Sequence, residues 1–316
     1  MVVLQKPIVG LRADLGPSNL GGQRVDEHAD GAAGASARAG GEDGAWPVLP
    51  QEGDTERPNV ARMYDHLLGG AHNFAPDRDM ASRLLLANPD TARGARANRA
   101  FLRRAVRWCV RAGVEQFLDL GSGLPTVGTV HQLAHELNPG ARVAYVDLDP
   151  VAVAVSRALL RDDPRVGVTQ ADLRDSDTTL ALAGDVLRLD RPVAVLAVSV
   201  LHFLPGDLAA ILTPYRRRLV PGSVLALSHG STDHDDPELA ARCANVFSTM
   251  ARTGNPLVDR DRAQLRAALD GTRLVAPGLA DVTAWPGPTG DAPIGMYAAV
   301  ARHVSGSPGR RERTAG

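Results

Sequence analysis

Three aspartates stand where apolar, strand-like runs end, and each could hold a ligand there. Asp119 lies in FLDLGSG, Asp147 in AYVDLDP and Asp172 in TQADL. Ligands of open α/β sheets bind at the carboxyl ends of the strands, near the point where the strand order reverses. An acid that ends the second strand can accept hydrogen bonds from both hydroxyls of a ribose, and Asp147 follows the glycine loop at a suitable interval. Asp172 would lie one strand further out, within reach of an adenine amino group.

The loop Gly121-Ser122-Gly123 follows the first of these runs. Its glycines let the chain turn tightly and approach a ligand, because no Cβ intervenes. The third glycine of the dinucleotide fingerprint G-x-G-x-x-G is missing, since LPT comes next. A carboxylate at Asp119 would repel a pyrophosphate, but it suits a ligand with an ammonium and a sulfonium group. The loop and its acids favour S-adenosylmethionine, with a nicotinamide or flavin ligand and a purely structural turn as alternatives.

The spacing of apolar residues alternates along the chain between the period of a helix and that of a strand, and these elements must position the three acids. Helices are expected over about 91–112, 126–137 and 150–161, and the apolar stripe of the first is Leu102, Ala105, Val106 and Cys109. Strand-like runs lie between the helices, and several are apolar throughout, which indicates a parallel sheet covered on both faces. The last two runs, LADVTAW and IGMYAAVAR, are separated by a turn-rich segment. They predict a closing antiparallel pair.

The stretch YDHLLGGAHNFAPDR carries more chemistry than a connector needs. A helix that ends at Gly69-Gly70 would let the chain turn across the pocket, so 57–90 is expected to form a helical lid. Tyr64 or Phe74 would then face a sulfonium, which an aromatic ring attracts. Asn73 would present its amide to the carboxylate of the donor or to the acceptor, and Arg78 would pair with a carboxylate. The alternative is a segment that only packs against the edge of the sheet.

Several stretches together resemble one known family. They are RPNVARMYDHLLGGAHNFAPDR, NRAFLRRAV, QFLDLGSGLPT, VAYVDLDPVAV, ADLRD, PVAVLAVSVLHFLP and PGSVLALSH. The sequence resembles an actinobacterial family of S-adenosylmethionine-dependent methyltransferases that was formerly known only as a domain of unknown function. The resemblance covers most of the chain from 57 to about 232. It does not supply the methyl acceptor.

The resemblance implies the class I methyltransferase fold, a doubly wound α/β sheet of seven mostly parallel strands whose last strand is antiparallel. It implies that Gly121 and Gly123 line the methionine moiety of the donor. By the same resemblance, Asp147 holds the ribose, and Asp172 with Leu173 frames the adenine. The chain departs from the family pattern at Leu148, beside the adenosine, where the family often has Asn.

Two histidines are candidates for a general base if the acceptor must lose a proton. His202 follows the fourth strand-like run, and His229 closes the fifth. A buried, hydrogen-bonded histidine is the alternative for His202. His229 opens HGSTDHDD, which is expected to be a solvated loop or an acceptor contact. A metal site is not expected, because metal ligands usually converge from more than one element.

Composition limits the partners. The chain has 316 residues, a net charge of -1 and a sequence pI of about 6.8, so no global charge calls for nucleic acid or an anionic membrane. The arginines of 96–111 are expected to form a solvated face, since no aromatic ladder accompanies them. Cys109 and Cys243 have no nearby partner, which is typical of a reducing cytosol. No signal peptide or membrane span is expected.

The sequence therefore predicts a cytoplasmic methyltransferase that acts on a small-molecule acceptor. Residues 57–304 are expected to form the catalytic domain, with unstructured segments at 1–56 and 305–316. One alternative is a sensor or pseudoenzyme that binds S-adenosylmethionine without transferring its methyl group. A less favoured alternative is a nicotinamide-dependent oxidoreductase.

Overall fold

The computed structural model describes residues 55–125, 128–287 and 289–304. All of them belong to one compact unit, residues 44–316. The expectations for 1–56 and 305–316 fall on residues that, apart from Thr55 and Glu56, lie outside the described ranges.

The unit is built on one sheet in the order β3-β2-β1-β4-β5-β8-β6, with β7 paired to β8. Strands β1 to β5 run parallel, and β8 is antiparallel to β5. The bounds are β1 Gln116–Leu120, β2 Arg142–Asp147, β3 Val166–Gln170, β4 Ala194–Val198, β5 Val224–Gly230, β6 Thr272–Leu274, β7 Ala280–Asp281 and β8 Met296–His303. The order reverses between β1 and β4, where a ligand site is expected. The mostly parallel sheet with an antiparallel strand is confirmed.

The closing antiparallel pair is also present, in a shorter form than expected. Strand β7 pairs with β8 through Ala280–Ala298 and Asp281–Tyr297. The following residues leave the strand, and the buried Trp285 packs edge-on against Phe101 instead. Counted with β7, the sheet has eight strands.

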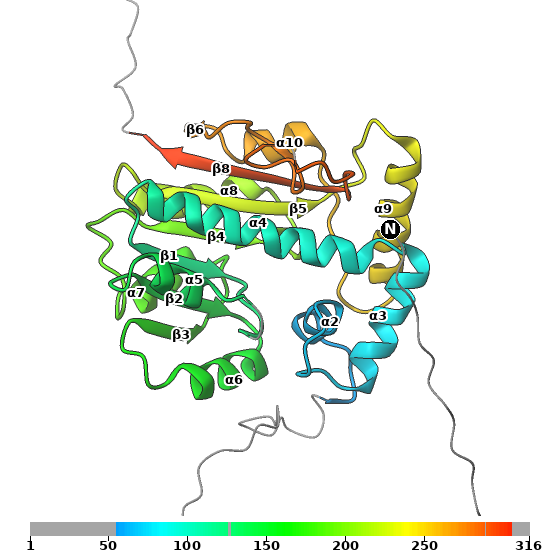
Figure 1. Cartoon of the computed structure of the whole chain (residues 1–316), viewed down its shortest axis with the longest axis horizontal. Helices are drawn as coiled ribbons and strands as arrows, with labels where there is room; N and C mark the ends of the chain where they lie inside the picture. Colours follow the sequence, from blue (N-terminus) through cyan, green and yellow to red (C-terminus); the bar gives the residue numbers. More distant parts are fainter. Residues whose placement is uncertain (1–54, 126–127, 288, 305–316) are drawn as a thin grey trace, which may run out of the picture. The chain divides into compact units, whose positions relative to one another are not determined.

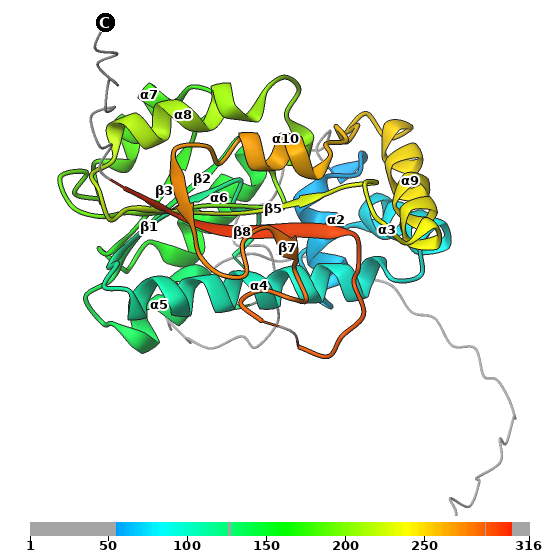
Figure 2. The ribbon, with the colours of Figure 1, turned by 90° about the horizontal axis from the view of Figure 1, so that it is seen from above.

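Helices cover both faces of this sheet (Figures 1 and 2). On one face lie α4 and α5, and on the other lie α7, α8 and α10. The bounds of these helices are α4 Thr91–Arg111, α5 Val130–Leu137, α7 Ser176–Ala183, α8 Leu208–Arg218 and α10 Arg262–Ala267. Helix α6, Pro150–Leu160, follows β2. The predicted stripe of α4 is confirmed, because Leu102, Ala105, Val106 and Cys109 are all buried.

Local caps explain where several helices begin. The side chain of Asp149 accepts a hydrogen bond from the Val151 N–H at the start of α6, and Pro150 occupies the first turn. Asp207 caps α8 in the same way. An aspartate that ends a loop thus sets the first turn of the next helix, which also fixes the position of the loop beside it.

Three further helices stand together at one end of the sheet (Figure 1). They are α2 Val60–Leu67, α3 Ala75–Ala87 and α9 Pro237–Ala251. Met63, Met80, Leu84 and Met250 join them in a small apolar core of their own. This core is separate from the two that cover the faces of the sheet. The helical segment expected ahead of the first strand is therefore present.

Candidate functional site

A pocket of about 780 Å³ lies at the carboxyl ends of the central strands. One side is formed by the loops after β1, β2 and β3, and the other by α2, α9 and the segment after α9. Its volume falls in the range of small-molecule sites. The three strand-end aspartates of the sequence analysis all line it.

Both glycines of the loop have a left-handed backbone, and Gly121 also packs closely against Val200. Gly121 has a φ of 66°, and a Cβ there would lie 2.2 Å from Val200 Cγ2. Gly123 has a φ of 62°, and its N–H donates to the Asp147 carboxylate at 2.7 Å. The left-handed backbone favours glycine at both positions. Between them, Ser122 lines the pocket, and its N–H donates to Val146 O at 3.2 Å.

Asp147 is held from two sides. Besides the Gly123 bond, its second oxygen accepts from the Asp149 N–H at 2.9 Å. Each carboxylate oxygen has a further acceptor position, so Asp147 can still receive two hydroxyl hydrogens. Burial raises the pKa of this carboxyl. Asn59, which caps α2, donates to Asp149 at 2.5 Å and ties that helix to the end of β2.

The residues expected around an adenine lie at the outer end of the pocket. The Asp172 carboxylate is paired with Arg174 at 2.5 Å, which lowers its pKa. Leu173 is buried, and its carbonyl accepts from the Tyr215 hydroxyl at 2.6 Å. Leu148 is 60% exposed, although it is large and apolar. Both leucines line the pocket and offer apolar surface to a flat ring.

Asp119 and Arg99 face the inner part of the pocket. Burial raises the pKa of Asp119 to about 7, and the positive charge of Arg99 opposes that rise. The Arg99 Nε atom is buried and has no hydrogen-bond partner. Its guanidinium lies 5.5 Å from the centroid of the Tyr64 ring. A buried carboxylate and an unpaired guanidinium thus lie in one cavity, which suits a zwitterion.

Arg99 was expected on the solvated face of its helix, and the structure corrects this. Asn98 and Arg99 precede Leu102 by four and three positions, so both lie on the same face of α4 as the apolar stripe. The period of the stripe could have identified them. The excess of arginine on the rest of the helix concealed the signal.

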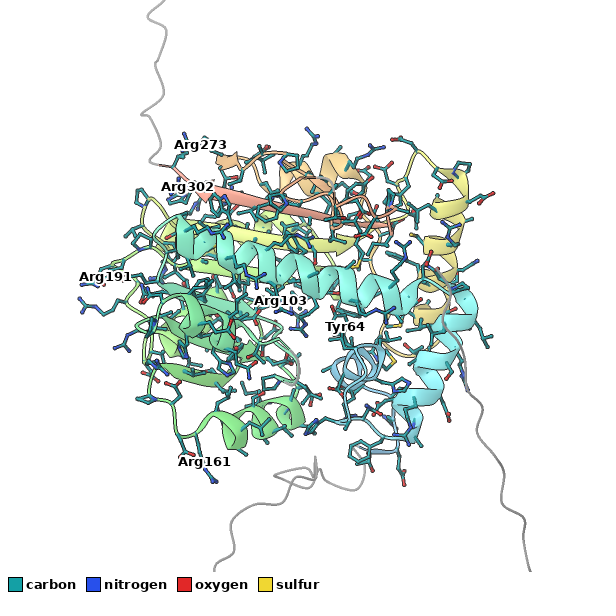
Figure 3. The ribbon with its side chains drawn as sticks, in the orientation of Figure 1. Tyr64, Arg103, Arg161, Arg191, Arg273 and Arg302 are labelled. Carbon is teal, nitrogen blue, oxygen red and sulfur yellow. The ribbon has the colours of Figure 1, made fainter. Side chains whose placement is uncertain are left out.

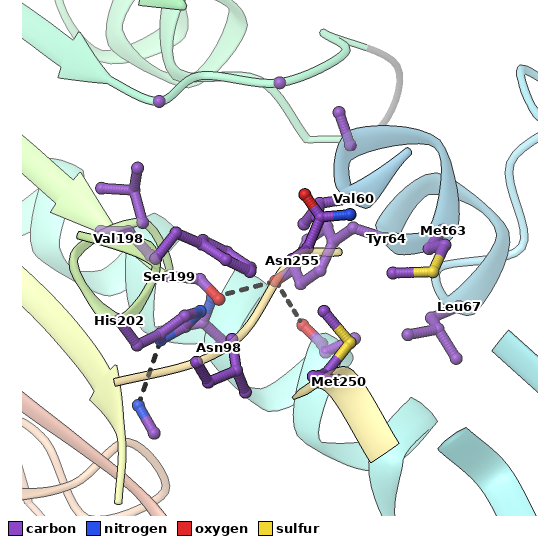
Figure 4. A pocket seen from close by; sticks show the side chains of 18 of the residues that line it. Val60, Met63, Tyr64, Leu67, Asn98, Val198, Ser199, His202, Met250 and Asn255 are labelled. Atoms are coloured by element: carbon purple, nitrogen blue, oxygen red, sulfur yellow. Dashed lines mark hydrogen bonds between the residues drawn. The ribbon is translucent and has the colours of Figure 1, made fainter. Parts of the chain in front are cut away.

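Tyr64, labelled in Figure 3, is held by a series of hydrogen bonds, some of which Figure 4 marks. Its hydroxyl donates to Ala95 O at 3.0 Å and accepts from the Asn98 amide at 2.9 Å. The Asn98 oxygen accepts from Ser228 Oγ at 2.6 Å, and Ser228 Oγ accepts from the Ser199 N–H at 2.9 Å. Ser199 has a φ of 60°, which is rare for a residue other than glycine. These hydrogen bonds join α2, α4 and the ends of β4 and β5 around the pocket.

Three expected ligand contacts of the stretch 64–78 do not line the pocket. The Asn73 amide donates to Asp65 at 3.0 Å and to Gly70 O at 2.9 Å. Arg78 donates to Asn73 O at 2.9 Å, and Phe74 lies under the Arg62 guanidinium at 5.5 Å. Their polar groups are used within the stretch, so this geometry does not support direct contact with a ligand.

His202 lines the pocket and is neutral. It belongs to the short 3-10 helix η1 Leu201–Phe203, and its Nδ1 accepts from the Gly230 N–H at 3.3 Å. Burial, His229 and Arg260 together hold its pKa well below the ordinary value. Because Nδ1 accepts, the hydrogen of the neutral ring is on Nε2. His202 can therefore donate a hydrogen bond through Nε2, and its lowered pKa makes it a weak base.

His229 is fully buried and does not line the pocket, which corrects the expectation that it faces an acceptor. Its Nε2 accepts from Arg260 at 3.1 Å, and its Nδ1 bonds to Gly230 O at 2.5 Å. Burial lowers its pKa to about 4. Both ring nitrogens are engaged, so His229 has a structural role. Asp233 and Asp235 of the same loop pair with Arg262.

The remaining part of the pocket is apolar (Figure 4). It is lined by Met63 and Leu67 of α2, Phe203 of η1, Val246, Phe247 and Met250 of α9, and Leu257. Asn255 lies among them and lines the pocket as well. No three potential metal ligands come together within residues 55–125, 128–287 and 289–304. Over the same ranges, no helix has the length and apolar character needed to cross a membrane.

Comparisons with known proteins agree on one family. A family model described as S-adenosyl methyltransferase matches residues 48–304. A proposed methyltransferase from Thermobifida fusca has 34% identity and a TM-score of 0.75, over 82% of this chain and 100% of its own. A DUF574 family protein from Streptomyces avermitilis has 32% identity and a TM-score of 0.73, over 79% of this chain and 99% of its own. No curated protein matches significantly.

Proposed function

Since the chain belongs to the S-adenosyl methyltransferase family, we propose that its pocket transfers the methyl group of S-adenosylmethionine to a small-molecule acceptor. The chain is an S-adenosylmethionine-dependent methyltransferase, and the proposal concerns its site and its acceptor. We assign the catalytic domain to 57–304, with 57–90 covering the pocket. A cytoplasmic location is part of this hypothesis, supported by two buried thiols that form no disulfide.

The adenosine part of the donor would bind at the outer end of the pocket. Asp147 would accept the two ribose hydroxyls through its free acceptor positions. Leu148 and Leu173 would cover the two faces of the adenine ring, and Asp172 would lie near its amino group. The exposure of Leu148 supports this assignment, because a bound ring would cover it.

The observation that carries the proposal is the pair of unlike charges at the inner end. The amino-acid part of the donor is a zwitterion, and the site offers a carboxylate and an unpaired guanidinium. Asp119 would accept hydrogen bonds from the ammonium, with Ser122 and the backbone of Gly121 and Gly123 beside it. Arg99 would donate to the carboxylate, the role that the sequence had suggested for Arg78.

Bound S-adenosylmethionine supplies an electrophilic methyl group on a positively charged sulfur. The chain must hold the acceptor about 3–3.5 Å from that carbon and in line with the sulfur. Tyr64, fixed by Ala95 and Asn98, lies beside this part of the pocket and can stabilise positive charge through its ring. The apolar wall excludes water from the reacting atoms.

No described side chain of the apolar part acts as an evident base. His202 would donate its Nε2 hydrogen to the acceptor rather than remove a proton. An acceptor with a lone pair that is available at neutral pH needs no base, and any proton on the methylated atom can leave to water afterwards. The chemistry then depends on alignment more than on acid–base catalysis.

A small acceptor is also consistent with the distribution of basic residues. Among the arginines labelled in Figure 3, Arg273 and Arg302 are neighbours on β6 and β8, whereas Arg103, Arg161 and Arg191 lie apart from them. Nucleic-acid binding usually needs a basic patch or stripe. The pocket itself contains the charges that the donor requires.

The proposal is tested by following S-adenosylhomocysteine while the full chain is incubated with S-adenosylmethionine and a metabolite extract. We expect the product to appear only when both the chain and the extract are present. Binding without product would leave a sensor, the alternative of another class. Calorimetric binding of NAD in place of both adenosyl ligands would contradict the assignment of the pocket.

A further inference from the structure

We propose that the methyl acceptor is an uncharged, mostly apolar compound with at least one ring, bound between α2 and α9. This inference rests on the proposed function, because it assigns the part of the pocket that the donor leaves free. Three features of the chain carry it: the apolar wall, the placement of the charges, and two neutral polar groups that face the cavity.

The wall consists of adaptable apolar side chains. Met63 and Met250 are each 3% exposed and face the pocket from α2 and α9. Phe203 and Leu257 complete the wall and pack on the same apolar core. Methionine is flexible and polarisable and fits flat or irregular apolar ligands. A phenylalanine in the same wall can pack against an aromatic ring.

The charged side chains of the pocket either lie on the side assigned to the donor or have partners. Within the described residues, the arginines that line it are Arg99 and Arg174, and both lie on the donor side. Arg174 is paired with Asp172. Asp65 accepts from the His72 N–H at 2.8 Å and from the Asn73 amide.

Asp90, a further acid that lines the pocket, is also paired. Asp90 accepts from Arg93 at 3.0 Å. An anionic acceptor would therefore enter an apolar wall without a counter-charge. A cationic acceptor would meet carboxylates that already have partners. Burial of an unpaired charge is strongly unfavourable, so the wall selects against both.

Two neutral polar groups remain for recognition. The side-chain amide of Asn255 has no hydrogen-bond partner among the described residues, and it points into the cavity (Figure 4). The Nε2 hydrogen of His202 is the second group. An amide and an imidazole N–H can bind a hydroxyl, a carbonyl or a ring nitrogen, which are uncharged.

The segment that carries Asn255 is fixed in place. The Val258 N–H donates to His202 O at 2.7 Å. The buried Arg260 donates to Leu201 O at 3.2 Å, to Leu204 O at 2.6 Å and to Gly206 O at 2.7 Å. His229, which accepts from Arg260, orients this guanidinium. The segment is therefore built to hold Asn255 and Leu257 beside His202.

The test uses three probes that share one ring system and differ in charge: 2-naphthalenemethanol, 2-naphthoate and 2-naphthylmethylammonium. Each is titrated into the full chain saturated with S-adenosylhomocysteine and followed by naphthalene fluorescence. We expect the neutral alcohol to bind roughly tenfold or more tightly than either ion. Leu257→Asn should weaken binding of the alcohol by about tenfold and leave the dissociation constant of S-adenosylhomocysteine unchanged.

Leu86→Asn is the matched control, since Leu86 is 86% exposed on α3 and does not line the pocket. This variant should change neither the dissociation constant of the alcohol nor that of S-adenosylhomocysteine. Equal or tighter binding of an ion, no binding of the alcohol at 1 mM, or an unchanged alcohol constant in Leu257→Asn overturns the inference. So does a parallel loss of S-adenosylhomocysteine binding in that variant. Wild-type chain that does not bind S-adenosylhomocysteine refutes the proposed function instead.

Discussion

Arg99 has a buried donor atom without a partner, and its side chain lines the pocket. Its Nε–H has no acceptor in the unliganded pocket, and a buried donor without a partner is unfavourable. The guanidinium that carries it lines the pocket, where a carboxylate of the donor would supply a counter-charge. The role of Arg99 can be separated from that of Asp147, because one would bind the amino acid and the other the ribose.

Arg99→Gln is expected to weaken S-adenosylhomocysteine binding by ~1.5–3 kcal/mol, the usual value of hydrogen bonds to a charged group. Binding of 5′-methylthioadenosine, which lacks the amino-acid end, should not change. Calorimetric titration of both ligands measures the difference. Arg96→Gln, an exposed position on the same helix, is the control. An equal loss for both ligands would mean that Arg99 only supports the fold.

Asp119 predicts a pH dependence of binding. Its pKa is raised to about 7 without ligand, and an ammonium beside it would lower that pKa. Binding then requires loss of a proton below pH 7, so the affinity for S-adenosylhomocysteine should fall as the pH is lowered from 7.5 to 6. Asp119→Asn should bind weakly and without this slope, and 5′-methylthioadenosine should show no slope with the wild type. A slope that persists in Asp119→Asn would exclude Asp119 as its source.

At the scale of elements, the stretch 64–78 is a scaffold for α2 and α3. The buried Asp77 accepts from Arg62 Nε at 2.8 Å, from the Phe74 N–H and from the Asn59 N–H, so it starts α3 and fastens α2 to it. Gly70 is required because a Cβ there would lie 2.1 Å from Asp65 Oδ1. Residues 69–78 of the stretch do not line the pocket, and they hold Tyr64 and the neighbouring Met63, which do.

Asp77→Ala should therefore lower the free energy of unfolding by ~3–5 kcal/mol, because the buried Arg62 guanidinium would lose its carboxylate counter-charge. Asp79→Ala, at an exposed position of the same helix, should change it by less than ~0.5 kcal/mol. Urea unfolding of the unliganded chain compares the two. Similar stability of the two variants would show that the Arg62–Asp77 pair does not fasten these helices.

The sequence was sufficient for most of the elements and for the three strand-end acids of the pocket, but not for Arg99. Strand periods and the carboxyl-end rule placed Asp119, Asp147 and Asp172 around one cavity. The roles of Asn73 and His229 could not be predicted, because they depend on which partner each polar group meets after folding. Asn73 meets Asp65 within its own loop, and His229 meets Arg260 from a distant segment.

For the whole molecule, the pocket combines segments that lie far apart in the sequence. The loops after β1 to β3 line the side that we assign to the donor, and α2, α9 and residues 255–257 line the side that we assign to the acceptor. This division separates a charged part from an apolar part. The assignment of S-adenosylmethionine to the charged part is the central claim, since the acceptor site is defined by what the donor leaves free.

That claim is tested most directly by titrating S-adenosylhomocysteine into the wild-type chain and Asp147→Ala. We expect the variant to bind ~1.5–3 kcal/mol more weakly, because two hydroxyls lose a charged acceptor. Its affinity for 5′-methylthioadenosine should fall equally, since both ligands carry the ribose. A thermal melt without ligand confirms that the variant is folded. An unchanged dissociation constant in the folded variant would contradict the assignment of the donor to this pocket.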